Sequence, residues 1–402
     1  MLASLLCIVA MSTLQMPAVH GDVARTPPPP PPPPSIDAAL YRALDPATTD
    51  APTILDCAPQ HCGCRMRCEP VATPKRSVEI VMYTRSWFIT YSKDMYPALP
   101  GTLECPTTMC KVTYGPSFQP TTDVLLMVHD EFPAKRRKEK LHAGQFFAMM
   151  NLEPIIIPSE TYQRGRVDVL ITHQTQNAGD FPVLPQAYAV GSEHRLRAPI
   201  VPFSNRLGRI PVWISNPNRI GYDRLAIIAE LARYLPVLSI FPINHTLPMD
   251  MARDFPMCRH HTERKVVHDY NRRTFEKECA LRFSRVTLAF ESFQYENYMT
   301  EKVAEPLRSG CVPVYIGAPN VKQLLPHPSA AIHMADFASV KDAAAYIYRA
   351  ISEEAVWASH QEWRRRPFSP GFDAILKTQT DGVFCQLCEW VSEQRARNAT
   401  AS

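Results

Sequence analysis

One stretch, residues 285–317, constrains the fold of this chain more than any other. Its apolar run Val286–Phe290 is bounded by polar residues, as a buried strand would be. After a polar loop, Tyr298–Ser309 has the pattern of a helix, and Gly310 stands where a helix end favours positive φ. Val312–Ile316 has the pattern of a second buried strand. The stretch therefore predicts a β-α-β unit.

The junction between the loop and the predicted helix carries three chemically useful residues. Tyr298, Glu301 and Lys302 are spaced i, i+3 and i+4, so they would share one face of the first helical turn. Free N–H groups and the positive end of the helix dipole favour a phosphate there, and Lys302 adds a charge. Glu301 can accept hydrogen bonds from ribose hydroxyls, and Tyr298 can pack on a base or sugar. A surface Glu-Lys pair is the competing interpretation, and spacing alone favours it.

The residue order of this stretch favours the functional interpretation, because it resembles the signature of the α1,3/α1,4-fucosyltransferases (glycosyltransferase family 10). That family carries Phe-Glu after a strand, then Tyr-x-Thr-Glu-Lys, then Gly-x-Val-Pro-Val-x-x-Gly. The matching segments here are Phe290-Glu291, Tyr298–Lys302 and Gly310–Gly317. The sequence Ile-His-Met-Ala-Asp-Phe at 332–337 is also similar to the family.

Three positions in the stretch need comment. The family usually has Asn after Phe-Glu and often Asp before the Tyr, where this chain has Ser292 and Asn297. Ser292 keeps a hydrogen-bonding group but is shorter, so its contact with a donor nucleotide would be weaker or carried by water. Pro306 lies inside the predicted helix, where it removes one backbone bond and favours a kink.

Length and charge restrict the class of protein. With 402 residues and 46% hydrophobic content, the chain can bury the cores of two domains. A net charge of +4 gives no electrostatic case for nucleic acid as a partner. No Asp-x-Asp, Gly-x-Ser-x-Gly or Gly-x4-Gly-Lys sequence occurs. The absence of Asp-x-Asp argues against a metal-clamped pyrophosphate, and the absence of the other two motifs leaves a hydrolase or P-loop enzyme without support. We expect no metal site and no required cofactor, while stimulation by a divalent cation stays open.

The N-terminal part resembles a secretory leader followed by a spacer. Residues 1–21 include the uncharged run Leu2–Met11, which is short for a membrane span of about 20 apolar residues. A cleaved signal peptide is the direct interpretation, whereas the family resemblance implies an uncleaved anchor. The protein would then be a single-pass type II protein of the Golgi lumen, or luminal or secreted after cleavage. Residues 22–74 contain the polyproline run Pro27–Pro34 and are expected to form a stem.

Cysteine usage and two sequons agree with an oxidising compartment. Twelve cysteines are many for a reduced cytosolic protein. Four of them cluster in the stem, at Cys57, Cys62, Cys64 and Cys68. Local disulfides are favoured for this cluster over a zinc site, and their connectivity stays open. The Asn-x-Thr sequons at Asn244 and Asn398 are candidate glycosylation sites.

Residues 75–205 predict a first α/β domain, with an acceptor-binding role implied by the resemblance. Buried runs at 78–82, 124–128, 146–152 and 167–172 alternate with polar connections, which is typical of a parallel sheet covered by helices. Ligands bind beyond the carboxyl ends of such strands. Glu153 follows one strand, in a segment that resembles the one carrying the family's catalytic base. His129 and Asp130 follow another and partly match an acceptor motif.

Residues 206–360 predict the second domain, and 361–402 a C-terminal tail. A helix over Tyr222–Tyr234 has an apolar stripe, with Arg224 in its first turn. The resemblance places a basic residue there on the donor pyrophosphate; an exposed arginine on an ordinary helix is the alternative. The family also closes with Cys-x-x-Cys bonded to cysteines of the first domain. The disulfide candidates are Cys105, Cys110, Cys385 and Cys388.

The resemblance covers roughly 77–390 and implies a GT-B fold, with two Rossmann-like doubly wound domains facing across a cleft. It implies inverting transfer of L-fucose from GDP-β-L-fucose to a GlcNAc hydroxyl, α1,3 or α1,4, of a glycoprotein glycan. Glu153 would be the base. The predicted donor-binding residues are Arg224, Glu291, Ser292, Asn297, Tyr298, Glu301 and Lys302. The alternative is a catalytically inactive glycan- or nucleotide-binding protein on the same fold.

Overall fold

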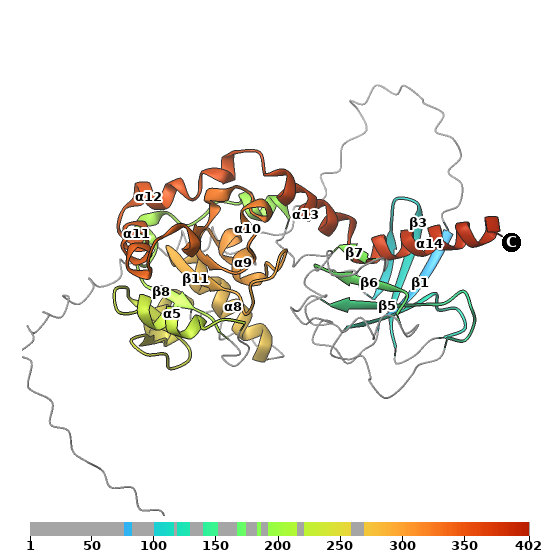
Figure 1. The fold of residues 1–402 in the computed structure, drawn as a ribbon, viewed down its shortest axis with the longest axis horizontal. Helices are drawn as coiled ribbons and strands as arrows, with labels where there is room; N and C mark the ends of the chain where they lie inside the picture. The colour runs from blue at the N-terminus through green and yellow to red at the C-terminus, as the bar shows by residue number, and fades with distance from the viewer. Residues whose placement is uncertain are drawn as a thin grey trace, which may run out of the picture. The chain divides into compact units, whose positions relative to one another are not determined.

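The computed structural model describes residues 76–82, 100–115, 119–128, 140–151, 167–173, 183–185, 192–214, 221–258 and 269–401. The predicted leader, stem and stem cysteines lie outside these residues, as do His129, Asp130 and Glu153. The described residues include two α/β sheets, one from each half of the chain (Figure 1). The expectation of two α/β domains with mainly parallel sheets is confirmed.

The first sheet has the strand order β2-β3-β1-β4-β5-β6-β7. Its strands are β1 (Arg76–Met82), β2 (Gly101–Glu104), β3 (Thr108–Tyr114), β4 (Val124–Val128), β5 (Phe146–Asn151), β6 (Val169–Thr172) and β7 (Val183–Pro185). All neighbours pair in parallel except β2, which runs antiparallel to β3 at the edge. The order β3-β1-β4-β5-β6 is that of the flavodoxin type of doubly wound sheet. The sequence pattern did not predict β2, β3 or β7.

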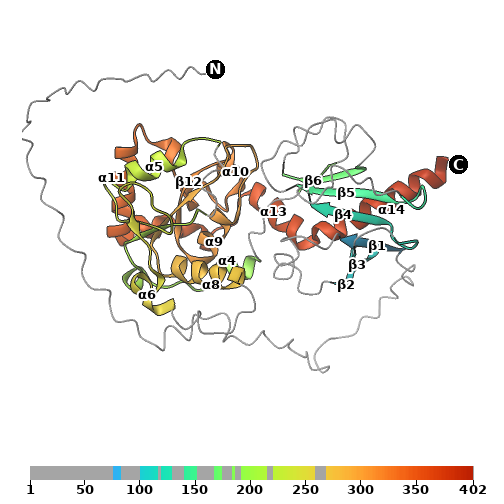
Figure 2. The same ribbon diagram turned by 90° about the horizontal axis from the view of Figure 1, so that it is seen from below.

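The C-terminal helix α14 (Val383–Ala401) covers one face of this first sheet (Figure 2). Alternate residues of β1, such as Ile80 and Met82, pack with Phe384 and Leu387 of the helix. Two disulfides, Cys105–Cys385 and Cys110–Cys388, join the helix to the region of β2 and β3. The disulfide pairing implied by the family resemblance is therefore confirmed. A native disulfide typically contributes about 2–4 kcal/mol, so the tail is a structural part of the first sheet.

The second sheet is fully parallel, with the order β10-β9-β8-β11-β12-β13. Its strands are β8 (Ile210–Val212), β9 (Val237–Ser239), β10 (Leu247–Pro248), β11 (Val286–Phe290), β12 (Val312–Ile316) and β13 (Ile332–His333). This is the Rossmann order 3-2-1-4-5-6, in which the chain reverses direction between β8 and β11. A ligand site is expected at that reversal, beyond the carboxyl ends of the two strands.

Helices cover both faces of the second sheet. On one face, alternate strand residues such as Leu288 and Val314 pack with α5 (Arg224–Leu231) and α11 (Val340–Ser352). On the other face, Ala289 and Tyr315 pack with helices α9, α10 and α13. Their bounds are Glu301–Ser309, Val321–Leu324 and Pro370–Asp381. Burial on both faces explains why the strands are continuous apolar runs in the sequence.

Further helical segments flank these elements. They are α4 (Glu193–Arg197), η4 (Phe203–Asn205), α6 (Met251–Asp254), η5 (Pro256–Cys258), α8 (Asp269–Arg282), η6 (Pro328–Ala330), η7 (Met334–Asp336), α12 (Glu354–Ser359) and η8 (Glu362–Arg365). A third disulfide, Cys258–Cys279, links η5 to α8. Among the residues that the structure describes, no helix has the length and apolar content needed to cross a bilayer.

Helix α9 begins three residues later than the sequence predicted. Thr300 is its N-cap, and the Thr300 side chain accepts a hydrogen bond from the N–H of Lys302. Tyr298 lies in the preceding loop, where Asn297 has a positive φ of 62°. The expectation that Tyr298 shares the first helical turn with Glu301 and Lys302 is therefore wrong. Gly310 ends the helix with φ of 70°, as predicted from its position.

Candidate functional site

The candidate site lies where β8 and β11 end, at the reversal of the Rossmann order. Arg224 begins α5, the first helix after β8, and Glu291 directly follows β11. The two loops are joined because the Tyr222 hydroxyl donates to the carbonyl oxygen of Glu291 at 2.9 Å. The N–H of Gly221 also donates to the carbonyl oxygen of Ser292 at 2.8 Å. Two segments that are far apart in the sequence thus form one edge of the candidate site.

Glu291 is fully buried and is tied to the start of α9. Its carboxylate accepts a hydrogen bond of 2.8 Å from the N–H of Thr300 and bonds of 2.8 and 2.9 Å from the Thr300 hydroxyl. Burial raises the pKa of Glu291, and the Lys302 ammonium at 3.3 Å opposes that rise. The first N–H groups of this helix start are therefore occupied from within the protein. An anion at this site would therefore be attracted by the charge of Lys302, because the backbone N–H groups already have partners.

Lys302 lies between two carboxylates. Its ammonium is 3.1 Å from Glu301 and 3.3 Å from Glu291, and its side chain is 19% exposed. Burial would lower the pKa of Lys302, but the two carboxylates outweigh burial and raise it. Burial also acts to raise the pKa of Glu301, and Lys302 together with Lys277 brings it down to about 2. Lys302 and Glu301 are thus held as an ion pair with little access to water.

Arg224 provides a second cation beside this pair, and its side chain is buried. Its guanidinium Nη1 is 3.5 Å from the carbonyl oxygen of Phe290, the last residue of β11. Burial lowers the pKa of Arg224, while Tyr222, Glu291 and Tyr298 oppose that change. An arginine keeps its charge through such a shift because its ordinary pKa is above 12. Two cations thus flank the end of β11.

The loop that carries Tyr298 is fixed by hydrogen bonds. Asn297 and Asn320 bond reciprocally, at 2.9 Å from the Asn297 N–H and 2.7 Å from the Asn320 side-chain amide. The hydroxyl of Tyr298 is 3.3 Å from the hydroxyl of Ser292. Tyr315 of β12 donates to the carbonyl oxygen of Tyr298 at 3.3 Å. Of the predicted donor-binding residues, the structure therefore brings all seven to one place, and their contacts with a donor stay predictions.

The glycine at the end of the sequence signature has a packing reason. A side-chain carbon at Gly317 would overlap the Tyr315 hydroxyl and the side chain of Glu291. Any larger residue would displace the carboxylate that holds the start of α9. Gly317 of the signature is therefore required for close packing beneath the site.

Sequence reasoning missed three residues that build the site. Thr300 and Tyr222 join its segments, as described above. His173, directly after β6, packs on Tyr298 with ring centroids 5.1 Å apart. It is 5% exposed, and within the described part of the chain its Nε2 has no hydrogen-bond partner. Burial lowers its pKa to about 4. Its position at the carboxyl end of a parallel strand was a signal that could have identified it.

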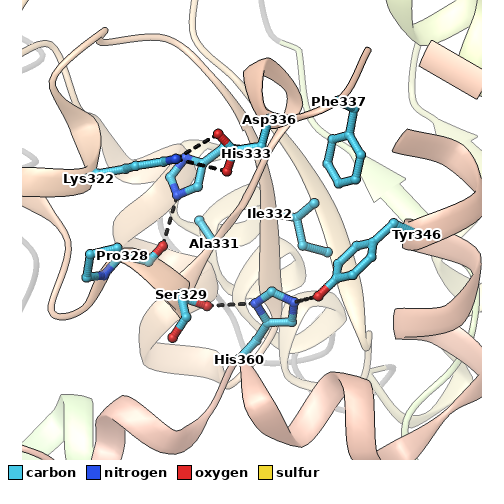
Figure 3. Close-up of a pocket in the computed structure, with 10 residues that line it drawn as sticks. All are labelled: Lys322, Pro328, Ser329, Ala331, Ile332, His333, Asp336, Phe337, Tyr346 and His360. Carbon is cyan, nitrogen blue, oxygen red and sulfur yellow. Dashed lines mark hydrogen bonds and ion pairs between the residues drawn. The ribbon is translucent and has the colours of Figure 1, made fainter. Parts of the chain in front are cut away.

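A separate pocket of about 390 Å³ lies along the edge strand β13 (Figure 3). It is lined by Lys322, Pro328, Ser329, Ala331, Ile332, His333, Asp336, Phe337, Tyr346 and His360. Here the polar groups satisfy one another, as Figure 3 shows: Lys322 pairs with Asp336, and His333 bonds the carbonyl of Pro328. None of the predicted site residues lines this pocket, which we call the edge pocket.

The described residues contain no group of three or more His, Cys, Asp or Glu side chains suited to a metal ion. The two sequons differ in their surroundings. Asn244 is exposed in a turn closed by the N–H of Thr246 and the carbonyl oxygen of Ile243. Asn398 is exposed within helix α14, where the Thr400 hydroxyl bonds back to Arg397.

Comparison with known proteins gives a consistent result. Residues 258–402 match the model of "glycosyltransferase family 10 (fucosyltransferase) C-term". The chain is 33% identical over 240 residues to an α-(1,4)-fucosyltransferase of Arabidopsis thaliana, covering 58% of this chain and 56% of that protein. It is 38% identical over 77 residues to human GDP-fucose protein O-fucosyltransferase 3, covering 19% of this chain and 16% of that protein. The chain thus spans little more than half the length of the first relative and less of the second.

Similar solved structures include a crystal structure of α1,3-fucosyltransferase with GDP-fucose. The match has 16% sequence identity and a TM-score of 0.48, and it covers 78% of this chain and 93% of that structure.

Proposed function

From its glycosyltransferase family 10 domain at residues 258–402, we propose that this chain transfers L-fucose from GDP-β-L-fucose to a GlcNAc hydroxyl of a glycoprotein glycan. One observation carries the proposal. The family's Tyr-x-Thr-Glu-Lys segment and Arg224 lie together at the reversal point of a Rossmann-type sheet, where such folds bind nucleotides.

The buried Arg224 and the largely shielded Lys302 fit a diphosphate leaving group. Lys302 and Arg224 would offset the negative charge that grows on GDP as the bond to the sugar breaks. An ammonium has three donors, so Lys302 can bond a phosphate oxygen while keeping a carboxylate partner. The sequence leaves open whether a divalent cation stimulates the transfer. Assaying the transfer with and without a chelator tests this.

The transfer would invert the anomeric centre in a single displacement, as the family resemblance implies. Such a step needs one base to take the proton of the acceptor hydroxyl. Glu153 is proposed for that role, and His129 and Asp130 for acceptor contacts; all three rest on sequence resemblance. In Glu153→Gln we expect transfer to be lost and GDP binding to persist, whereas undiminished transfer would refute the assignment.

The names of the relatives point to two kinds of reaction. The plant relative is an α-(1,4)-fucosyltransferase, and the human one is a protein O-fucosyltransferase. A GlcNAc hydroxyl of a glycan, in α1,3 or α1,4 linkage, is the acceptor proposed first because the longer match is to the plant protein. A hydroxyl on a protein is the second candidate. A catalytically inactive nucleotide-binding protein is the alternative outside enzymes.

One assay separates these possibilities. The purified full chain is incubated with GDP-fucose and with panels of N-glycans and of folded and unfolded protein acceptors, and released GDP is measured. Release that depends on glycans supports the first proposal, and release that depends on protein acceptors supports the second. GDP binding without transfer to any acceptor would overturn both and favour the binding protein.

We further propose that the chain works in the Golgi lumen, held by its N-terminal segment or released from it by cleavage. The cysteine content, the disulfides and the exposed sequon at Asn244 support this proposal. In secretory cells, a glycosidase-sensitive mass shift should disappear in Asn244→Gln. Asn398→Gln, in a helix, should change the shift less. A chain without any such shift would contradict the luminal location.

A further inference from the structure

His173 differs from the other buried histidines that the structure describes. It lies at the carboxyl end of β6, and its ring packs on Tyr298 with centroids 5.1 Å apart and planes inclined by 42°. His333 bonds the carbonyl oxygen of Pro328, and His360 bonds both Ser329 and Tyr346. Among the three, His173 alone has a fully buried ring nitrogen, Nε2, without a hydrogen-bond partner.

A buried nitrogen without a partner calls for an explanation. Most buried polar atoms are hydrogen-bonded, because an unsatisfied one loses its bonds to water without replacement. If the ring served only to fill space beside Tyr298, an apolar side chain of similar size would do so without this cost. The cost is recovered if a bound molecule supplies the missing partner.

The surroundings indicate the chemistry of that partner. Tyr298 raises the pKa of both Arg224 and Lys302, so the ring on which His173 packs lies near the two cations of the site. Those cations are the groups suited to phosphate. Burial holds the imidazole in its neutral form at neutral pH. A neutral imidazole can both donate and accept, which suits a hydroxyl group better than an anion.

We propose that His173 contacts a sugar hydroxyl in the ternary complex, either of the transferred fucose or of the acceptor. This inference rests on the proposed fucosyl transfer. The Tyr298 ring packs against the His173 ring, and the Tyr298 hydroxyl makes a long bond of 3.3 Å to Ser292. Through this residue, the carboxyl end of β6 selects for the sugar, while Arg224 and Lys302 bind the phosphates.

The test uses two substitutions at one position and one control in the full-length chain. His173→Phe keeps the ring on Tyr298 and removes the nitrogen, whereas His173→Gln restores a polar atom near Nε2. His194→Phe changes an exposed histidine of α4 and serves as the control. Affinities for GDP and GDP-fucose are measured by calorimetry, with kcat and KM for donor and acceptor and thermal unfolding of each variant.

A contact with fucose predicts that His173→Phe weakens GDP-fucose binding roughly tenfold while leaving GDP binding unchanged. A contact with the acceptor predicts unchanged donor binding and a roughly tenfold rise in acceptor KM. In either case His173→Gln should recover part of the loss, and His194→Phe should match the wild type. Equal loss for GDP and GDP-fucose, or no loss at all, would overturn the inference. A wild-type chain that binds neither nucleotide would overturn the proposed function and this inference together.

Discussion

The loop after β11 and the edge pocket along β13 contain similar residues in different states. Each has a lysine, a carboxylate and an adjacent histidine with a lowered pKa. In the edge pocket the Lys322–Asp336 pair is half exposed, at 49% for each side chain. After β11, Lys302 is 19% exposed and Glu291 fully buried. Charges of the same kind thus lie in water at one place and are shielded from it at the other.

This difference in exposure, rather than cavity size, favours the region after β11 as the proposed donor site. An exposed ion pair contributes little because water screens it. A shielded pair interacts strongly with any charge that enters, because the local dielectric constant is low. The edge pocket is open and its polar atoms are paired, so we expect it to be structural. The following experiments test that distinction.

The largest effect is expected from removing the lysine of each region. Lys302→Ala leaves two carboxylates without their shared cation and removes a charge from the proposed donor site. We expect transfer to fall at least about a hundredfold, with lower stability as well, because breaking a buried pair typically costs about 3–5 kcal/mol. Lys322→Ala should change kcat/KM by less than about threefold. Equal effects of the two substitutions on transfer kinetics would break the comparison.

The pH dependence of stability should differ between the two regions. The pKa of His173 is about 4 in the folded chain, below its ordinary value of 6.5. As the pH falls from 6.5 to 4, the unfolded chain binds a proton that the folded chain refuses, so the free energy of unfolding falls by up to about 3 kcal/mol.

His173→Phe should therefore flatten this acid loss without lowering stability at pH 7. His360→Phe also removes a histidine of lowered pKa, but it should cost stability at pH 7 because two hydrogen bonds are lost. Denaturant unfolding across the pH range checks both variants. A His173→Phe protein with an unchanged acid loss would contradict the assignment.

Helix caps give a third, smaller contrast. Thr300→Val removes the hydroxyl that caps α9 and bonds Glu291, and we expect a loss of about 2 kcal/mol in the free energy of unfolding. Ser339→Ala removes the exposed cap of α11 and should cost about 1 kcal/mol. Thr300→Ser keeps the hydroxyl and is the matched control. A Thr300→Val protein as stable as the wild type would show that Glu291 does not depend on this cap.

The smallest effect is expected inside the edge pocket. Tyr346→Phe removes the hydroxyl that donates to His360, one hydrogen bond worth about 1 kcal/mol. Thermal unfolding should shift slightly, and transfer kinetics should stay at the wild-type level. A clear loss of activity in this variant would show that the edge pocket takes part in function.

Much of the second sheet was predictable, because its strands are buried on both faces. Val286–Phe290 and Val312–Ile316 were placed with the bounds that the structure has, and Gly310 was assigned correctly as the end of α9. The two-residue strands β10 and β13 carry too few residues for a periodic signal. In the first sheet, β3 alternates buried and exposed residues and β2 lies at the edge, so neither has a continuous apolar run.

The site was predictable in its residues and not in its contacts. The residue spacing predicts that Tyr298 lies in the helix. In the structure the helix starts after its N-cap Thr300, and Asn297, with positive φ, turns the backbone just before Tyr298. Local sequence cannot show that the partner of Thr300 is Glu291, because that pairing depends on how the loop folds back. The packing of His173 on Tyr298 could not be predicted, because the two residues are distant in the sequence.

The sequence by itself determined the α/β class, the buried strands β11 and β12, and the segment that carries Lys302, because burial and local propensity act over short distances. The tertiary structure decided which charges are shielded: Lys302 between Glu291 and Glu301, and His173 on Tyr298. It also decided which cysteines pair, Cys105 with Cys385 and Cys110 with Cys388. Shielding and long-range pairing depend on atoms that only the folded chain brings together. These atoms determine how strongly each charged group interacts with its neighbours.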